Sequence, residues 1–202
     1  MYLPAHFEEP RVEVLHRLID AYPLGVLVTA GGSGLEANHL PFLIDPQPAP
    51  FGILRAHVAR ANPVWRELGD TIEPLVVFQG PSHYVTPSWY PTKAATGKVV
   101  PTYNYVVVHA YGRIRAIEDR AWLRELVTRL TRRHETGPNP WQVADAPADY
   151  LDTMLGAIVG LEIEVTRLLG KWKVSQNRAP ADRAAVGERV ADSEIGRWMP
   201  EL

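Results

Sequence analysis

The chain has 202 residues, a formal net charge of −2 and an apolar share of 46%, which suits one large domain with a buried core. It contains no cysteine, so disulfide bonds, thiolate metal sites and a cysteine nucleophile are excluded, and we predict no metal site. The small negative charge argues against a surface tuned throughout for nucleic acid. We see neither a signal peptide nor a membrane span and therefore expect a cytoplasmic protein.

The first quarter of the chain predicts a helix followed by a β-hairpin. Apolar side chains recur at three- and four-residue spacing in the helix, and short Val- and Leu-rich runs flank a Gly-rich turn, which is typical of a hairpin. Asn38 and His39 are adjacent in the return strand, so they face opposite sides of it. Either one needs a partner if it is buried. The predicted elements are a helix over 9–22, strands over 24–30 and 35–44, and a turn over 31–34.

A third strand over 52–58 leads directly into a short helix predicted for 64–68. His57, Arg60 and Asn62 cluster at this junction, with Asn62 as the N-cap residue. Free backbone N–H groups, the helix dipole and a guanidinium together favour an anion. Phosphate is the natural ligand, because arginine offers a fork of donors that matches its oxygens. The alternative is a capped helix beside a solvated arginine.

A long connection joins the strands predicted for 75–78 and 103–114. Connections of this length without regular structure are usually functional or disordered, and the aromatic content argues against disorder. Several rings and two lysines suit a flat ligand with an anionic tail, so we predict one side of a binding site. The alternative is a surface loop held by its own aromatic side chains. The side chains concerned are His83, Tyr84, Trp89, Tyr90, Lys93 and Lys98.

The second half of the chain predicts helices, one strand and a polar cluster. The helix over 119–135 is amphipathic and carries five arginines, which indicates a surface for nucleic acid or an acidic partner, or more often a solvated face. Gly160 is expected to separate a helix over 145–158 from a strand over 161–169. Lysines, a tryptophan and amide side chains follow that strand. The remaining predicted elements are a helix over 145–158, a strand over 161–169, the polar cluster over 170–178 and a helical tail from Pro180.

Long sequence blocks in a fixed order resemble the PaiB-type family of FMN-binding negative transcriptional regulators. The resemblance covers nearly the whole chain. It implies the pyridoxamine-phosphate-oxidase-like split barrel, a mainly β (α+β) fold that binds FMN at a homodimer interface. We expect a split-barrel domain with helical insertions over 1–178 and a helical appendage over 179–202. The blocks are MYLPAHF, ANHLPF (37–42), HVARANP (57–63), FQGPSHYVTPSWYPTK (78–93), VPTYNY (100–105) and IVGLEIEVTRLLGKWKVSQNR (158–178).

The same resemblance implies a set of FMN-binding residues. The flavin phosphate is expected at His57, Arg60 and Asn62, with Lys93 nearby. The ring is expected near Asn38, His39, Trp89, Tyr103 and Asn104. Lys171, Gln176 and Arg178 are expected to come from the partner subunit.

The sequence leaves three functions open. The first is a flavin-binding protein with redox capacity, an FMN-dependent oxidoreductase or a flavin sensor, in which His39 and Tyr103 are weak acid–base candidates. The second is a transcriptional repressor that acts through DNA or a protein partner, although no helix-turn-helix is evident. The third is haem binding or degradation, with His83 and His109 as the ligands to mutate.

Overall fold

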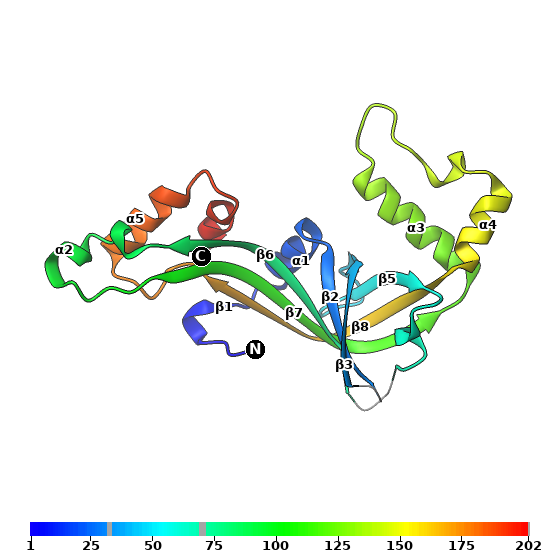
Figure 1. Ribbon diagram of the computed structural model, residues 1–202, viewed down its shortest axis with the longest axis horizontal. Coiled ribbons are helices and arrows are strands. Elements are labelled where there is room, and N and C mark those ends of the chain that lie inside the picture. The colour runs from blue at the N-terminus through cyan, green and yellow to red at the C-terminus, as the bar shows by residue number, and fades with distance from the viewer. Residues whose placement is uncertain (32–33, 69–71, 202) are drawn as a thin grey trace. The chain divides into compact units, whose positions relative to one another are not determined.

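The computed structural model describes residues 1–31, 34–68 and 72–201. Within them eight strands form one antiparallel sheet of the split-barrel kind, in the order β3-β2-β6-β7-β8-β5-β4, with β1 paired to β8 (Figure 1). The strands are β1 (Glu8–Glu9), β2 (Leu24–Gly31), β3 (Gly34–Pro41), β4 (Leu43–Asp45), β5 (Ile53–Ala59), β6 (Leu75–Val85), β7 (Thr102–Ile117) and β8 (Ile158–Lys173). The mainly β fold with added helices is thereby confirmed.

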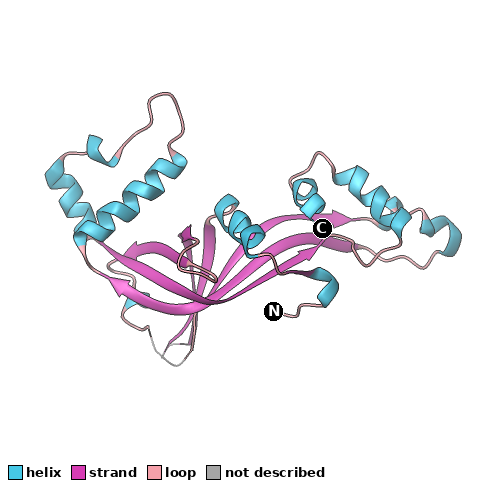
Figure 2. Ribbon diagram, turned by 180° about the vertical axis from the view of Figure 1, so that it is seen from behind, coloured by secondary structure: helices cyan, strands magenta, loops and turns pink. Residues whose placement is uncertain are grey.

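Along the chain the α-helices lie between these strands and after the last of them, and one 3-10 turn precedes β1 (Figure 2). The α-helices are α1 (Val12–Ala21), α2 (Thr92–Thr96), α3 (Arg120–His134), α4 (Ala148–Gly156) and α5 (Pro180–Val190). The 3-10 turns are η1 (Ala5–Phe7), η2 (Pro63–Trp65), η3 (Pro87–Trp89), η4 (Val143–Asp145) and η5 (Ile195–Glu201).

The chain divides into two compact units, which we describe separately. Strands β6, β7 and β8 contribute residues to both. Unit 1 comprises Met1–Leu18, Gln79–His109 and Leu169–Leu202, and unit 2 comprises Ile19–Phe78 and Ala110–Leu168.

Unit 2 holds the hairpin β2–β3, strands β4 and β5, and helices α3 and α4. Its barrel interior is filled by alternate strand residues: Leu54, Ala56 and Val58 of β5 are buried, while the intervening Arg55 and His57 are half-buried on the other face. Helix α3 packs on that outer face, where its Leu126 and Leu130 contact Leu43 of β4. The arrangement places the outward side chains of β5 beside α3.

Unit 1 is built on the remaining halves of β6, β7 and β8. The N-terminal strand β1 pairs with the end of β8, so that Glu8 lies opposite Lys171. Helix α5 packs on the segment after β6, where Val85, Tyr90 and Val186 form a small core. Asp182 of α5 accepts hydrogen bonds from the backbone N–H of Thr92 (3.1 Å) and from its hydroxyl (2.7 Å), which ties α5 to the start of α2.

Several predicted elements are confirmed. The first helix, the hairpin strands, the third strand, the basic helix and the helical tail all form, although residues 32–33 of the predicted turn lie outside the described part of the chain. Asn62 is the predicted N-cap and its Oδ1 accepts from the N–H of Val64 (3.0 Å). The element that it caps is shorter than predicted, since it is the 3-10 turn η2 instead of a helix over 64–68.

The long connection after residue 78 was predicted without regular structure, and this is wrong. Strand β6 continues to Val85, and η3 and α2 follow. The prediction failed because Gly80 and Pro81 follow Phe78 closely and residues of these types usually interrupt a strand. A Cβ atom on Gly80 would lie 2.6 Å from Val106 and 2.9 Å from Leu18, so this glycine lets β7 and α1 approach the strand closely.

Two further boundaries differ for local reasons. The return strand predicted over 35–44 is divided into β3 and β4 at Phe42, whose N–H donates to the carbonyl of Pro23 (2.8 Å). The helix predicted over 145–158 is α4, which ends at Gly156. Strand β8 already begins at Ile158, so Gly160 lies inside the strand. The ring of Trp122 covers Gly160, with a ring carbon 2.2 Å from the position that a Cβ would take.

Candidate functional site

The predicted FMN residues fall into two sets, one in each unit. Asn38, His39, His57, Arg60 and Asn62 belong to unit 2, and the remaining seven belong to unit 1. The structure therefore shows two local clusters, and each is built here from its own elements.

In unit 2 an amide pair joins β3 to the turn after β5. Asn62 Nδ2 donates to Asn38 Oδ1 (2.7 Å), while Asn62 Oδ1 caps η2. Asn38 is half-buried, and its neighbour His39 is exposed on the opposite side of β3. The pair fixes both amides in place between β3 and the turn after β5.

Arg60 is engaged with protein groups through all three guanidinium nitrogens. Its Nε donates to the carbonyl of Gly156 (2.7 Å), Nη2 donates to that of Ile158 (3.2 Å), and Nη1 pairs with Glu118 (2.5 Å). The guanidinium thus ties the end of β5 to the junction of α4 and β8. Two of its five N–H groups remain for a ligand, so a phosphate role for Arg60 stays a prediction.

His57 lines a pocket of about 300 Å³ on the outer side of β5. Its ring is half-buried, and Nδ1 is buried without a hydrogen-bond partner among the described residues. Burial lowers the pKa of His57 below its ordinary value of 6.5. Near pH 7 the ring is therefore neutral, with one donor and one acceptor nitrogen. The other lining residues are Pro41, Leu130, Thr131, His134, Glu135 and Trp141.

The cluster in unit 1 centres on a buried amide. Asn104 of β7 is fully buried, and its Oδ1 accepts from the hydroxyl of Ser175 (3.1 Å). Its Nδ2 has no partner among the described residues. Tyr103, the neighbour of Asn104, is exposed and its ring packs edge-on against that of Tyr84 (5.6 Å).

The C-terminal polar cluster follows β8 in the same unit. Lys171 is buried and its Nζ donates to the carbonyl of Tyr2 (3.0 Å). Gln176 holds the turn, because its side chain bonds the N–H of Val174 (2.8 Å) and the carbonyl of Trp172. The guanidinium of Arg178 lies 5.0 Å from the centre of the Tyr90 ring.

The aromatic side chains at the end of β6 and in η3 contact one another. Trp89 packs against His83 (5.5 Å between rings), and the Nδ1 of His83 is hydrogen-bonded to the carbonyl of Tyr84 (2.7 Å). Lys93 is exposed, with its Nζ 3.4 Å from Ser88 Oγ. His109 is half-buried, and burial is the largest cause of its lowered pKa.

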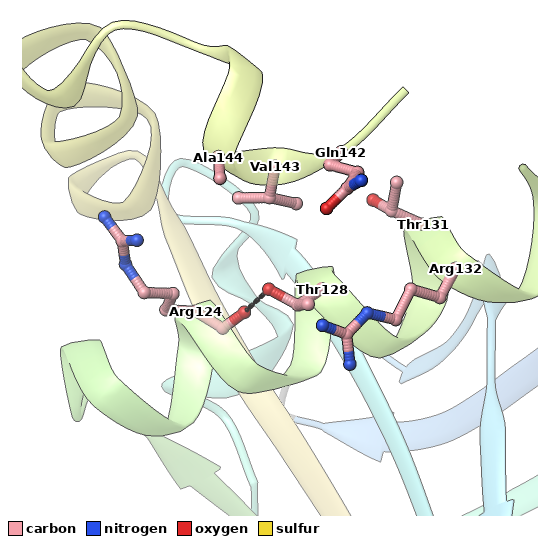
Figure 3. A pocket seen from close by; sticks show the side chains of 7 residues that line it. All are labelled: Arg124, Thr128, Thr131, Arg132, Gln142, Val143 and Ala144. Atoms are coloured by element: carbon pink, nitrogen blue, oxygen red, sulfur yellow. Dashed lines mark hydrogen bonds between the residues drawn. The ribbon is translucent and has the colours of Figure 1, made fainter. Parts of the chain in front are cut away.

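A second pocket in unit 2 lies between α3 and the segment around η4 (Figure 3). Arg124 and Arg132 line it, and neither guanidinium group makes a hydrogen bond or ion pair with another described residue, although the backbone carbonyl of Arg124 accepts from the hydroxyl of Thr128 (2.7 Å). Three other arginines of α3 are engaged: Arg120 with the carbonyl of Asp152, Arg129 with Asp45, and Arg133 with Asp20. The other lining residues are Thr128, Thr131, Gln142, Val143 and Ala144.

Sequence reasoning missed Trp141, Lys173 and Ser175 as candidate site residues. Trp141 follows a segment rich in glycine and proline, and an aromatic residue in such a loop is a usable signal. Lys173 lies two residues after Lys171 and therefore on the same face of the strand. Ser175 could not have been found, since its importance depends on contact with Asn104, 71 residues earlier.

Comparison with known proteins decides the family. The family model described as "Putative FMN-binding domain" matches residues 1–167. The chain belongs to this family. A relative from Bacillus subtilis, named "Protease synthase and sporulation protein PAI 2", is 31% identical over 100% of this chain and 96% of its own length. The predicted PaiB-type family is confirmed.

Other relatives of this FMN-binding-domain protein include an uncharacterized protein of Emericella nidulans, 39% identical over 92% of this chain and 88% of its own. Among solved structures, the FAD and haem binding protein from Mycobacterium smegmatis has a TM-score of 0.63 at 18% identity, covering 88% of this chain and 79% of that one. The flavocytochrome Anf3 from Azotobacter vinelandii has a TM-score of 0.61 at 13% identity, covering 88% and 75%. These two share the fold.

Two negative findings apply to the described residues. They contain no group of three or more histidine or acidic side chains arranged to hold a metal ion. None of their helices combines the length and the apolar character that crossing a membrane requires.

Proposed function

We propose that this protein binds FMN and that the pocket beside His57 receives part of the cofactor. The observation that carries the proposal is the buried Nδ1 of His57, which lacks a partner among the described residues in a chain of the FMN-binding family. A buried polar atom without a partner is costly, and a flavin offers both donors and acceptors to complete it. The pocket volume of about 300 Å³ lies within the range of small-molecule sites.

The residues around His57 fit a planar phosphorylated cofactor. The half-exposed ring of Trp141 offers an aromatic face for stacking. The paired amides of Asn38 and Asn62 and the remaining N–H groups of Arg60 do not line the pocket, but they offer further donors for phosphate or ring oxygens in the same unit. When bound, FMN would supply hydride or electron transfer, while these side chains would bind and orient it.

A fluorescence titration of the full chain with FMN tests the site. We expect His57→Ala to weaken FMN binding about tenfold, because one hydrogen bond and the ring contacts are lost. Trp141→Ala should have a similar effect, and it leaves the core intact because Trp141 is 49% exposed. The matched control is His6→Ala, an exposed histidine of unit 1. Unchanged FMN affinity in both pocket variants would contradict the proposal.

The homodimer and the redox activity are further proposals that rest on the family resemblance, and the cytoplasmic location is also a proposal. His39 and Tyr103 are both exposed, so either could reach a substrate, and they remain the acid–base candidates. Size-exclusion chromatography with light scattering tests the dimer. Reduction of bound flavin by a nicotinamide donor, followed by reoxidation, tests the redox activity.

The alternative function is regulation of transcription through DNA, with α3 as the candidate surface. Arg124 and Arg132 are the arginines of that helix whose guanidinium groups have no partner among the described residues, and unpaired guanidinium groups can contact phosphate. A gel shift at physiological salt should then lose specific binding in Arg124→Gln/Arg132→Gln. Binding that equals the nonspecific level in the unmodified protein would exclude this role.

Haem binding is the other alternative, and it has a distinct optical signature. The Mycobacterium smegmatis protein that shares the fold is described as an FAD and haem binding protein. His83 and His109 are both half-buried, so either could approach a ligand. A Soret band that persists in variants of both histidines would remove them as haem ligands.

A further inference from the structure

The pocket beside His57 is bordered by the C-terminal end of α3. Leu130, Thr131 and His134 belong to the last turns of this helix, and Glu135 is its C-cap residue. The last carbonyl groups of a helix lack helical donors and carry the negative end of the helix dipole. The helix end that borders the pocket therefore attracts a cation and repels an anion.

The side-chain charges around the pocket act in the same direction. Among the described residues, no lysine or arginine lines it, and Glu135 is its one carboxylate. Two arginines of the same helix end are placed elsewhere, since Arg133 pairs with Asp20 and Arg132 lines the pocket drawn in Figure 3. Glu135 forms no ion pair with any residue that the structure describes, so its negative charge at the pocket is not compensated.

An aromatic side chain lies close to this carboxylate. The backbone N–H of Trp141 donates to Glu135 Oε2 (3.3 Å), which ties the loop after α3 to the helix end. Trp141 is 49% exposed and lines the pocket. Tryptophan is the side chain whose ring face attracts organic cations most strongly. A carboxylate and a tryptophan ring that border one pocket suit an ammonium group on an apolar body, for which Leu130 and Pro41 supply further contacts.

His57 is compatible with a cationic ligand. Burial lowers the pKa of its ring, so the ring stays neutral near pH 7 and does not repel a positive charge. A neutral imidazole offers one acceptor nitrogen, and an ammonium group has N–H donors that can satisfy it.

We propose that this pocket binds a small organic amine in its ammonium form, with an aromatic or apolar body. Glu135 accepts a hydrogen bond from the ammonium group, and the ring of Trp141 contacts the cation and the body beside it. The inference rests on the proposed function in one respect, that the pocket is a ligand site, and it adds the chemical class of a ligand other than FMN. The pocket volume of about 300 Å³ suits a ligand of this size.

Calorimetric titrations of the full chain test the preference for a cation. The probes are 2-phenylethylamine, 2-phenylethanol and 3-phenylpropanoate, which share an aromatic body and carry a positive, no and a negative charge. We expect the amine to bind about fivefold more tightly than the alcohol, and the carboxylate to bind most weakly. The titrations are run at pH 8, because histidine side chains are mostly neutral there while the amine keeps its charge.

Two variants locate the preference in the pocket. Glu135→Gln should weaken amine binding about fivefold and leave alcohol binding unchanged. The variant should fold, because glutamine still offers an acceptor to the N–H of Trp141. Trp141→Leu should weaken amine binding about two- to fivefold through loss of the ring face. The matched control is Glu125→Gln, an exposed carboxylate of α3 that does not line the pocket, and it should leave all three affinities unchanged.

Equal affinities for the amine and the alcohol in the unmodified protein would overturn the inference. An equal loss of amine binding in Glu125→Gln and Glu135→Gln would show only nonspecific attraction and would also overturn it. The FMN titrations fail separately. A Glu135-dependent preference for the amine, together with unchanged FMN affinity in His57→Ala and Trp141→Ala, would support the amine site and contradict the proposed FMN site. The opposite pair of results would do the reverse.

Discussion

At the residue scale, the stability of unit 2 depends on a carboxylate buried between two arginines. Glu162 is 6% exposed, and its oxygens accept from Arg55 Nε (2.7 Å) and from Arg115 Nε (2.9 Å). Burial alone would raise the pKa of Glu162, but the hydrogen bonds and charges of Arg55 and Arg115 outweigh it and lower the pKa below 4.5. Arg55 also pairs with Asp45, so Glu162 belongs to a network.

We predict that Glu162→Gln lowers the free energy of unfolding by about 2 kcal/mol, because charge-assisted hydrogen bonds to a buried carboxylate are lost. Urea unfolding at pH 7 measures this effect. The control is Arg115→Gln, whose side chain is 72% exposed and whose loss should cost at most about 1 kcal/mol. Equal costs in the two variants would show that Glu162 is not the centre of the network.

The same carboxylate gives a prediction for pH. A group whose pKa is lowered on folding stabilises the protein above its unfolded value and loses this contribution as the pH falls through the folded value. The difference in unfolding free energy between the unmodified protein and Glu162→Gln should therefore be full at pH 6 and shrink below about pH 4.5. A difference that grows on acidification would have the wrong sign.

At the element scale, the packing of α3 on β8 requires a glycine. The Cβ of an alanine at Gly160 would lie 2.2 Å from the Trp122 ring, so the ring or the strand would have to move. We predict that Gly160→Ala lowers the free energy of unfolding by about 1–3 kcal/mol, the usual cost of overpacking. Gly137→Ala is the control, because nothing lies within 4 Å of its Cβ position. Equal stability of the two variants would contradict the packing.

Sequence periodicity was sufficient for elements whose pattern is local. The amphipathic helices and the β2–β3 hairpin follow from spacing and turn residues alone. The extension of β6 through Gly80 and of β8 through Gly160 could not be predicted in this way. Gly80 packs against Val106 and Gly160 packs against Trp122, and both partners are distant in sequence. A glycine that allows close approach and a glycine that ends a strand look the same in a sequence.

At the scale of the whole molecule, the sequence predicted the fold through its family resemblance, while the flavin-site residues that it named stay a prediction. It did not predict their partners. Arg60 is already bonded to two carbonyls and to Glu118, and Lys173 stands among cations without a carboxylate in the described residues. The hydrogen bonds and ion pairs of a cation depend on contacts between segments that are distant in sequence. Only the structure therefore distinguishes an arginine that holds the fold together from a cation that is free to bind a ligand.

The measurement that tests the account most directly is an absorption spectrum of the purified full chain, recorded before and after addition of FMN and again after size-exclusion chromatography. We predict a flavin spectrum that co-elutes with the protein and weakens in His57→Ala but not in His6→Ala. A protein that elutes colourless after incubation with excess FMN, or one that shows a Soret band in place of the flavin bands, would contradict the central claim.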